Sequence, residues 1–367
     1  SFGFSFSDEQ VRQEKLKTLH SLSDKMLAEK SPLIEFPINR AIIYTPVVYM
    51  PSVLAHWISN AAGLSVIENL YLARLFSMFA GCLLLYAAIR IIPVLKWPIA
   101  FLFLFPAAIH IRSSVSADTM ANSMILLFFA AVLYYRASGK ILNIREIACL
   151  TLLALMVSLS KSVYVCLLAM LLLLPVKRFK SISYYISMLV MCIVLPIIAN
   201  LLWSLEISHI YTLSKPPMEE VVTQNAVWTR PANIDESAQI QWILQNPLTF
   251  MHYFLPQLVT LPLFYIIDMG NLLIVPQVVA PAALIIFIFG GMYLIRDDIR
   301  LLTMTGYERL LIALIALGIL ALIFLMMFIV ATPVGDDAIG GIQGRYFLPI
   351  IPLILLCIKP QRLEKLK

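Results

Sequence analysis

Five basic residues occupy positions where a membrane protein should have few, and their side chains are suited to binding phosphate. They are Arg40, Arg74, Arg112, Lys161 and Arg345. Arginine presents a planar fork of N–H donors that matches phosphate oxygen atoms, and lysine presents a point charge. A charge at membrane depth is costly unless it is paired or functional. Several such cations converging at one leaflet would suit a phosphate or diphosphate attached to a lipid.

The composition is that of a membrane protein. The chain has 367 residues, of which 61% are hydrophobic and 13% charged, whereas soluble domains carry about 25% charged residues. The net charge of +6 comes mostly from short loops between apolar runs, which argues against a nucleic-acid partner. The five cysteines lie inside apolar runs with no paired spacing, so we expect neither a disulfide nor a metal site.

The apolar runs predict an all-α polytopic bundle with about nine spans. Two further apolar segments, 43–62 and 247–267, are interrupted by prolines, and we interpret them as interfacial or re-entrant helices. Residues 146–176 are broken at Ser160-Lys161 and form either a kinked pair or two short spans. The candidate spans are 67–91, 97–111, 117–136, 146–160, 162–176, 183–203, 272–295, 306–331 and 346–358.

The basic residues also predict an orientation. With the N-terminus outside, every short basic loop falls on the inner side, as the positive-inside rule requires. Counting 247–267 as a span would put the basic C-terminal tail outside, so we reject that version. Nine spans that start outside imply a further span upstream of Ser1, and we expect one there.

This topology divides the chain into four regions, two of which are long segments on the outer side. The outer segments, with the short outer loop 332–345, predict a site at the outer leaflet. The regions are 1–66, a first outer loop with juxtamembrane helices; 67–203, the transmembrane core; 204–271, an outer loop with a re-entrant or interfacial helix; and 272–367, the last spans with a basic inner tail.

Several of the charged residues also have an ordinary structural explanation. Arg112 could extend its side chain to the headgroups, and Arg74 could pair with a carboxylate to fix helix packing. Asp118 follows Ser116 just before an apolar run, so it could be an N-cap or a first-turn acid. Lys161 is harder to explain in this way, because ionisable groups inside an apolar run are functional by default.

Short motifs that occur in order along the chain resemble those of a known family. The chain, over about residues 36–358, is similar to a bacterial family of polytopic membrane proteins that is grouped with the GT-C glycosyltransferases and long catalogued as a membrane domain of unknown function. The last motif below is the most specific. The motifs are Tyr44-Thr-Pro-Val-Val-Tyr-Met-Pro51, Ala73-Arg-Leu75, Ser116-Ala-Asp118, Ser160-Lys-Ser-Val-Tyr164, Gln245-Asn-Pro247 and Gln343-Gly-Arg-Tyr-Phe-Leu-Pro349.

The resemblance implies a transferase of the bacterial cytoplasmic membrane, with its active site facing away from the cytoplasm. The donor would be a polyprenyl-phosphate-linked sugar and the acceptor a cell-envelope glycan, lipid or protein. Such enzymes usually hold a catalytic Asp-Glu pair followed by histidine early in the first outer loop. Asp8-Glu9 is the only such pair near the start and is followed by Gln10. Either the true motif lies upstream of Ser1, which we favour, or Asp8-Glu9 is a degenerate form of it and supplies the catalytic acid. No cofactor is implied with certainty, and a divalent metal stays open.

We assign roles on this basis. Arg345, Lys161, Arg74 and Arg40 would bind the donor phosphate and stabilise the departing anion. Asp118 is the best-placed acid of this chain, either as the base or, preferably, as a residue that orients the acceptor. The 204–271 segment would close over the site. Residues that would line the substrate pocket are Tyr44, Gln343, Tyr346, Trp228 and Arg112.

Three other functions stay open. A transporter or flippase of a lipid-linked or anionic solute would share the basic residues, but it should show inverted repeats, which we do not find. A polysaccharide polymerase or ligase would use the same face and the same lipid-linked chemistry. A non-catalytic subunit of an envelope complex would need no acidic motif.

Overall fold

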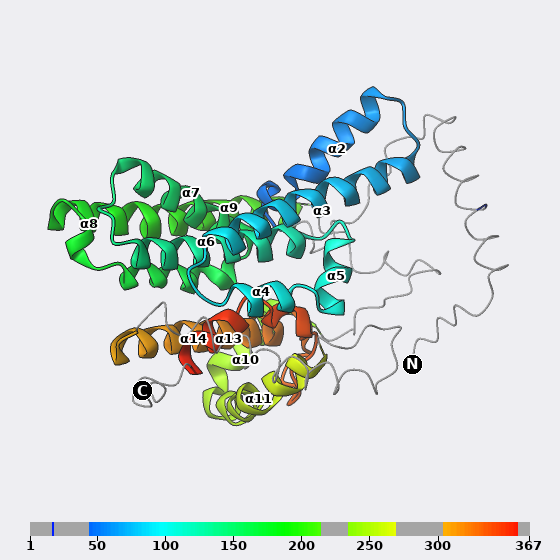
Figure 1. Cartoon of the computed structure of the whole chain (residues 1–367). Helices are drawn as coiled ribbons and strands as arrows, with labels where there is room; N and C mark the ends of the chain where they lie inside the picture. The colour runs from blue at the N-terminus through cyan, green and yellow to red at the C-terminus, as the bar shows by residue number, and fades with distance from the viewer. Residues whose placement is uncertain (1–16, 18–43, 214–233, 269–303, 359–367) are drawn as a thin grey trace.

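The computed structural model describes residues 17, 44–213, 234–268 and 304–358, and every element in its described segments is a helix (Figure 1). The elements are η2 (Pro46–Tyr49), α2 (Met50–Ala61), α3 (Val66–Ile91), α4 (Lys96–Leu102), α5 (Pro106–Arg112), α6 (Ala117–Ser138), α7 (Ile144–Ser160), η3 (Ser162–Leu173), η4 (Val176–Arg178), α8 (Ile182–Leu189), η5 (Val190–Val194), α9 (Leu195–Leu213), α10 (Glu236–Gln245), α11 (Pro247–Asp268), α13 (Gly306–Ala331), η7 (Gly344–Phe347) and α14 (Ile351–Ile358).

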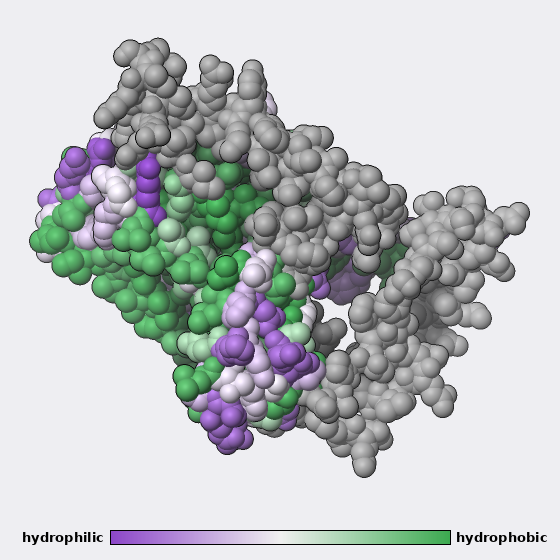
Figure 2. Space-filling view, turned by 90° about the horizontal axis from the view of Figure 1, so that it is seen from below, coloured by the Kyte–Doolittle hydropathy of each residue, from purple (hydrophilic) through white to green (hydrophobic). Residues whose placement is uncertain are grey.

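Among the described residues, four helical runs are long and apolar enough to cross a membrane: α3, α6, the run Ile182–Ser208 and α13. Within α6, 89% of the apolar window is buried, against 22%, 22% and 28% in the other three. The central helix of the bundle is therefore α6, and the other three present broad apolar faces outward. Figure 2 shows a wide hydrophobic surface over the described helices, with hydrophilic residues gathered at its edges. The prediction of a helical membrane protein is confirmed.

Small residues allow α3 to lie close against α6. The buried face of α3 includes Ala73, Ser77 and Gly81, a four-residue spacing of small side chains that is typical of helix contacts in membranes. A Cβ atom on Gly81 would lie 3.1 Å from Cγ2 of Thr119 on α6. The first half of α3 extends beyond the other helices together with α2 (Figure 1), and the hydroxyls of Ser52 and Ser77 join the two at 2.7 Å.

The bundle has two ends that differ in their charged groups. We call the end where α6 begins the Asp118 end. At the other end, which we call the Arg136 end, Arg136 forms a two-pronged pair with Glu308 in the first turn of α13, with Nε–Oε1 2.6 Å and Nη2–Oε2 2.8 Å. Glu308 also caps α13 through Thr305. This pair fixes α13 to the central helix.

The expected span 97–111 is not a single helix, and that prediction is wrong. The segment forms two seven-residue helices, α4 and α5, separated by residues 103–105. Phe105 has an extended backbone, with φ −61° and ψ 145°, because it precedes Pro106, and a residue before proline is pushed out of the helical region. Proline then occupies the first turn of α5, where its missing N–H costs nothing.

The expected break at Ser160-Lys161 is confirmed. Lys161 is extended, with φ −154° and ψ 124°, and α7 ends there. The twelve residues that follow form the 3₁₀-helix η3. A 3₁₀-helix rises about 2 Å per residue, so η3 extends about 24 Å, whereas an α-helix of that length would extend about 18 Å. The tighter winding lets a short apolar segment reach further across the bundle.

The expected span 183–203 lies within one continuous helical run formed by α8, the π turn η5 and α9. Pro196 lacks the N–H that would donate to the preceding turn, and the π turn directly before it is a common local adjustment of this kind. The Pro196 carbonyl accepts from the Ser158 hydroxyl at 2.8 Å, which joins this run to α7.

The two proline-containing segments are both helical. Residues 46–61 form η2 and α2, and α11 runs unbroken through Pro256 and Pro262 and packs against η7 and α13. Their interfacial or re-entrant placement stays a prediction, and the candidate span 272–295 lies outside the described residues.

Candidate functional site

Three charged residues that are far apart in the sequence meet at the Asp118 end of the bundle. Asp118 Oδ1 pairs with Lys161 Nζ, and Asp118 Oδ2 lies 3.3 Å from Arg345 Nε. The Asp118 and Lys161 side chains are each 9% exposed, while that of Arg345 is 35% exposed. We call these three residues the Asp118 cluster. The sequence singled out each of them, and the structure shows that one carboxylate joins both cations.

Helix termini position all three side chains. The Ser116 hydroxyl accepts from the Asp118 N–H at 3.2 Å and caps α6, which sets Asp118 in the first turn. The expectation of a first-turn acid is thus confirmed, in addition to the ion pair. Lys161 is the residue at which α7 ends. Arg345 lies in η7, the short helix that opens the last segment.

Two tyrosine rings flank the cations. Lys161 Nζ lies 5.3 Å from the ring centroid of Tyr44 and 5.1 Å from that of Tyr346. The Arg345 guanidinium carbon lies 5.4 Å from the Tyr346 ring. Cations at these distances are attracted to the electron-rich ring face. The two tyrosines predicted to line a substrate pocket therefore contact the charged groups directly.

Two further residues, which the sequence analysis did not single out, hold these rings. The Thr45 hydroxyl donates to the Leu159 carbonyl at 2.6 Å, which fastens Tyr44 beside the end of α7. The Tyr164 hydroxyl donates to the Tyr346 carbonyl at 3.1 Å. Thr45 and Tyr164 both lie within the family motifs of the sequence analysis. Only their hydrogen bonds in the folded chain show that they differ in role from the neighbouring residues of those motifs.

The Tyr44 phenol is held in its neutral form. Burial raises its pKa above the ordinary value of 10.0, and the carboxylate of Asp118 adds to this effect, although Lys161 opposes it. Tyr44 precedes η2 and lies outside the candidate spans. At neutral pH its hydroxyl is therefore a hydrogen-bonding group rather than a base.

The Asp118 cluster holds one positive charge in excess, because two cations share one carboxylate. Among the described residues, no other acidic side chain pairs with Lys161 or Arg345. Arg345 Nε is buried and has no hydrogen-bond partner in the described part of the chain, while the rest of its side chain is the most exposed part of the cluster. Such an arrangement favours binding of an anion.

Two glutamines hold the loop that leads to Arg345. Gln239 on α10 accepts from the Gly335 N–H at 3.0 Å and donates to the Phe328 carbonyl at 3.2 Å. Gln257 on α11 accepts from the Ile339 N–H at 2.9 Å and donates to the Asp337 carbonyl. Sequence reasoning missed both. The sequence feature that could have revealed them is a glutamine with a polar amide among mostly apolar helical residues.

Close approach of the backbone explains the glycines in the same loop. Gly341 has φ +75°, and a Cβ atom there would lie 2.7 Å from Cβ of Ala331. A Cβ atom on Gly340 would lie 2.9 Å from the Ala331 carbonyl oxygen. Both glycines therefore allow this loop to approach the end of α13 closely.

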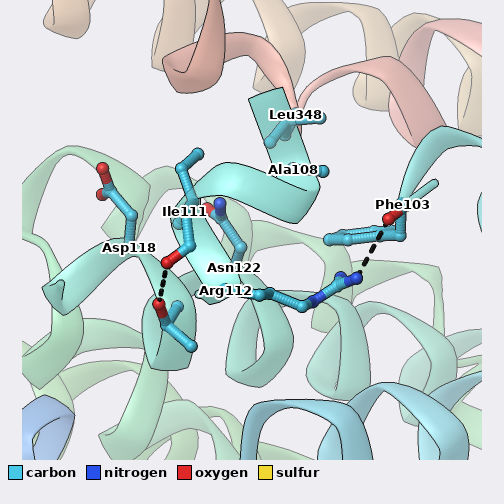
Figure 3. Close-up of a pocket in the computed structure, with 8 residues that line it drawn as sticks. Phe103, Ala108, Ile111, Arg112, Asp118, Asn122 and Leu348 are labelled. Carbon is cyan, nitrogen blue, oxygen red and sulfur yellow. Dashed lines mark hydrogen bonds between the residues drawn. The ribbon is translucent and has the colours of Figure 1, made fainter. Parts of the chain in front are cut away.

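A small pocket adjoins the Asp118 cluster, between α5, α6 and Leu348. Arg112 points across this pocket toward Phe103, away from Asp118 (Figure 3). Its Nη1 donates to the Phe103 carbonyl at 3.0 Å, and its guanidinium carbon lies 4.5 Å from the Phe103 ring centroid. Arg112 therefore lines this pocket and makes local contacts instead of joining the cluster, and its predicted role in a substrate pocket stays a prediction.

Arg74 is not joined to the cluster by any ion pair or hydrogen bond in the described part of the chain. It lies on the projecting half of α3, with its guanidinium carbon 5.7 Å from the Tyr71 ring centroid. Gly81 of α3 lies level with Thr119, the residue after Asp118. Arg74 precedes Gly81 by seven residues, and an α-helix rises 1.5 Å per residue, so Arg74 lies about 10 Å beyond the level of Thr119 along the α3 axis. The alternative explanation, in which Arg74 pairs with a carboxylate, is not seen among the described residues.

The remaining predicted residues contribute less or cannot be placed. Gln343 is exposed, and its carbonyl accepts from the Tyr346 N–H at 3.1 Å. The described residues contain no group of three or more His, Cys, Asp or Glu side chains that could hold a metal ion. Four predicted residues lie outside the described segments: Arg40, Trp228, Asp8 and Glu9.

Comparison with known proteins agrees with the membrane architecture. A family model described as "Predicted membrane protein (DUF2142)" matches residues 5–354. The chain belongs to this family. The DUF2142 match spans the whole Asp118 cluster, both tyrosines and the loop with its two glutamine contacts. No curated protein and no solved structure matches the chain.

Proposed function

We propose that this DUF2142 protein is a membrane glycosyltransferase that takes a sugar from a polyprenyl-phosphate-linked donor. The observation that supports the proposal is the Asp118 cluster, with its excess positive charge, at one end of a bundle of membrane-spanning helices. A lipid-linked phosphate brings an anion to that depth, and the lipid tail can lie against the apolar outer faces. The resemblance to GT-C enzymes supplies the reaction class.

The distribution of charge supports an extracytoplasmic site in the bacterial cytoplasmic membrane. Cytoplasmic loops carry an excess of lysine and arginine. The six described basic residues at or near the Arg136 end outnumber the four at or beyond the Asp118 end, which are Lys161, Arg345, Arg112 and Arg74, so we assign the Arg136 end to the cytoplasm. The basic residues of the Arg136 end are Arg90, Arg136, Lys140, Arg145, Arg178 and Arg309.

The proposed reaction is a single displacement with inversion. The acceptor oxygen forms a bond to the anomeric carbon while the bond from that carbon to the phosphate oxygen breaks, and the electron pair leaves with the phosphate. Lys161 and Arg345 stabilise this anion as preorganised donors. The phosphate replaces some of the contacts that the Asp118 carboxylate makes with Lys161 and Arg345.

Asp118 serves this reaction as a positioning residue rather than as the base. Its two oxygen atoms each face a cation, so neither is directed at an acceptor proton in this state. The acceptor proton passes to another carboxylate, and the only Asp-Glu pair near the start, Asp8-Glu9, lies outside the described residues.

Binding of the purified protein to undecaprenyl phosphate, compared with undecaprenol, tests the anion site directly. Native mass spectrometry should show that the wild type prefers the phosphate at least tenfold, since a charge-assisted contact contributes about 1.5–3 kcal/mol. Arg345→Ala and Lys161→Ala should each remove this preference. Arg136→Ala, which removes a cation at the opposite end, is the control and should keep it. Equal binding of both lipids by the wild type would refute the site.

Transfer is tested with a panel of undecaprenyl-phosphate sugars and membranes from a strain that lacks the protein. Labelled sugar should move to an envelope acceptor only when wild-type protein is added, and Arg345→Ala should abolish this. Movement of the intact lipid across proteoliposomes without transfer would instead indicate a flippase. Lengthening of a lipid-linked glycan would indicate a polymerase, and phosphate-lipid binding with no reaction a non-catalytic subunit.

A further inference from the structure

The pocket beside the Asp118 cluster contains a polar group with no assigned role. It is lined by Phe103, Ala108, Ile111, Arg112, Asp118, Thr119, Asn122 and Leu348. The pocket is open on one side, and the space in it that a water-sized group can occupy is roughly that of a single water molecule. A pocket of this size admits one hydroxyl-sized group and no complete sugar ring.

Most polar side chains around the pocket already have partners. The Thr119 hydroxyl donates to the Ile111 carbonyl at 2.8 Å, Arg112 Nη1 donates to the Phe103 carbonyl, and Asp118 pairs with two cations. These contacts shape the pocket but leave few of its groups available to a ligand.

Asn122 differs from these residues. Its side chain is 6% exposed, and within the described part of the chain its amide makes no hydrogen bond. Figure 3 shows this amide at the centre of the lining residues, one helical turn after Asp118. The amide atoms of Asn122 are not among the fully enclosed polar atoms that lack a partner in the described part of the chain, so they face the pocket and are available to a hydrogen-bonding group that enters it.

We infer that Asn122 hydrogen-bonds a hydroxyl group of the donor sugar and so helps to decide which sugar is accepted. This inference rests on the proposed function. Asp118 belongs both to the cluster and to the pocket, and Leu348 follows Arg345 by three residues. A group that enters the pocket is therefore adjacent to a phosphate held by Lys161 and Arg345, as the sugar of a phosphate-linked donor must be.

The amide can both donate to and accept from a hydroxyl, whereas an apolar pocket could not distinguish a hydroxyl from its absence. A site that is built to bond a hydroxyl rejects the analogue that lacks it far more strongly than an apolar site does. Asn122 is thus a residue for sugar specificity, and the cluster serves the phosphate that all donors share.

The test compares undecaprenyl phosphate with undecaprenyl-phosphate glucose, galactose, mannose and N-acetylglucosamine. For the wild type, at least one sugar should raise the affinity about tenfold over the bare phosphate lipid, as one good hydrogen bond would. Asn122→Leu, which is close in shape, should lose this gain and keep the affinity for undecaprenyl phosphate. A deoxy analogue of the preferred sugar lacks the bonded hydroxyl. Its affinity for the wild type should therefore be no higher than the affinity of the complete sugar for Asn122→Leu.

Ser123→Ala is the matched control, because it removes a buried hydroxyl from the next position of α6. That hydroxyl bonds the Thr119 carbonyl within the helix at 3.0 Å and is not part of the pocket. The control should keep both affinities. A sugar gain that persists in Asn122→Leu overturns the inference, as does a wild type that binds the phosphate lipid but gains from no sugar. Failure to bind any of the lipids would refute the proposed function itself.

Discussion

The Asp118 carboxylate, in the first turn of α6, forms a buried ion pair with the Lys161 ammonium just past the end of α7. Breaking such a pair leaves one charge buried and uncompensated, which costs about 3–5 kcal/mol, whereas removing both charges together can be nearly neutral. The pair therefore links the stability of two helix ends to the residues of the proposed anion site.

Asp118→Asn should lower the free energy of unfolding by about 3 kcal/mol, because it leaves Lys161 buried without its anion. The double variant Asp118→Asn/Lys161→Met should recover at least half of that loss, since the buried ammonium is removed and the only cation that loses its anion is Arg345, whose side chain is 35% exposed. Chemical unfolding of the detergent-solubilised protein measures both. Losses that simply add would show that the two side chains are not coupled. The double variant should still fail to bind undecaprenyl phosphate.

Alanine at two helix-interior glycines should have opposite effects. At Gly318 on α13, a Cβ atom meets only Cys166 Sγ, at 3.6 Å, so Gly318→Ala should gain about 0.5–1 kcal/mol from helix propensity. At Gly81 the new Cβ would lie 3.1 Å from Cγ2 of Thr119, so Gly81→Ala should gain nothing or lose stability. Thermal unfolding of both variants decides this. Equal gains would mean that α3 and α6 are not closely packed.

Gln257→Leu should loosen the loop that leads to Arg345. The variant removes the acceptor of the Ile339 N–H and the donor to the Asp337 carbonyl, at a cost of about 1–2 kcal/mol. Hydrogen–deuterium exchange should show faster exchange of the Ile339 amide, with weaker binding of undecaprenyl phosphate. Gln241→Leu changes an exposed glutamine of α10 and should alter neither. Unchanged exchange at Ile339 would contradict the proposed restraint.

Arg136→Lys should separate stability from binding. A lysine cannot reproduce the two-pronged contact with Glu308, so the free energy of unfolding should fall by about 1–2 kcal/mol. Affinity for undecaprenyl phosphate should stay at the wild-type level, because the pair lies at the opposite end of the bundle. Arg345→Lys should show the reverse pattern. Loss of lipid binding in Arg136→Lys would mean that the two ends are coupled.

Binding should show no pH step from Tyr44 below about pH 10, the ordinary tyrosine value. Its pKa is raised by burial, so the phenol stays protonated there, and any stability that depends on the neutral form is lost only as the pH rises beyond that value. Affinity for undecaprenyl phosphate measured from pH 7 to 9 should therefore have the same profile in Tyr44→Phe and in the wild type. A step present only in the wild type would contradict this.

The helical membrane class followed from the sequence alone. Apolar runs of spanning length have to form helices, because backbone groups cannot stay unpaired in lipid. The helix break at Lys161 and the first-turn position of Asp118 were also readable, since both depend on local backbone preferences. The division of residues 97–111 into α4 and α5 was not anticipated, although Pro106 was the local cause.

Only the tertiary structure decided which charges meet. Spacing along the chain does not show that one carboxylate joins Lys161 and Arg345, that Arg112 turns to Phe103, or that Arg74 projects past the cluster. These outcomes depend on how far each helix slides along its neighbour, which is set by contacts such as Gly81 against Thr119. The residue types therefore supplied the cations from which an anion site can be proposed, and the packing of α3, α6 and η7 decided which of them share the Asp118 carboxylate, because helix register is a property of the assembled bundle.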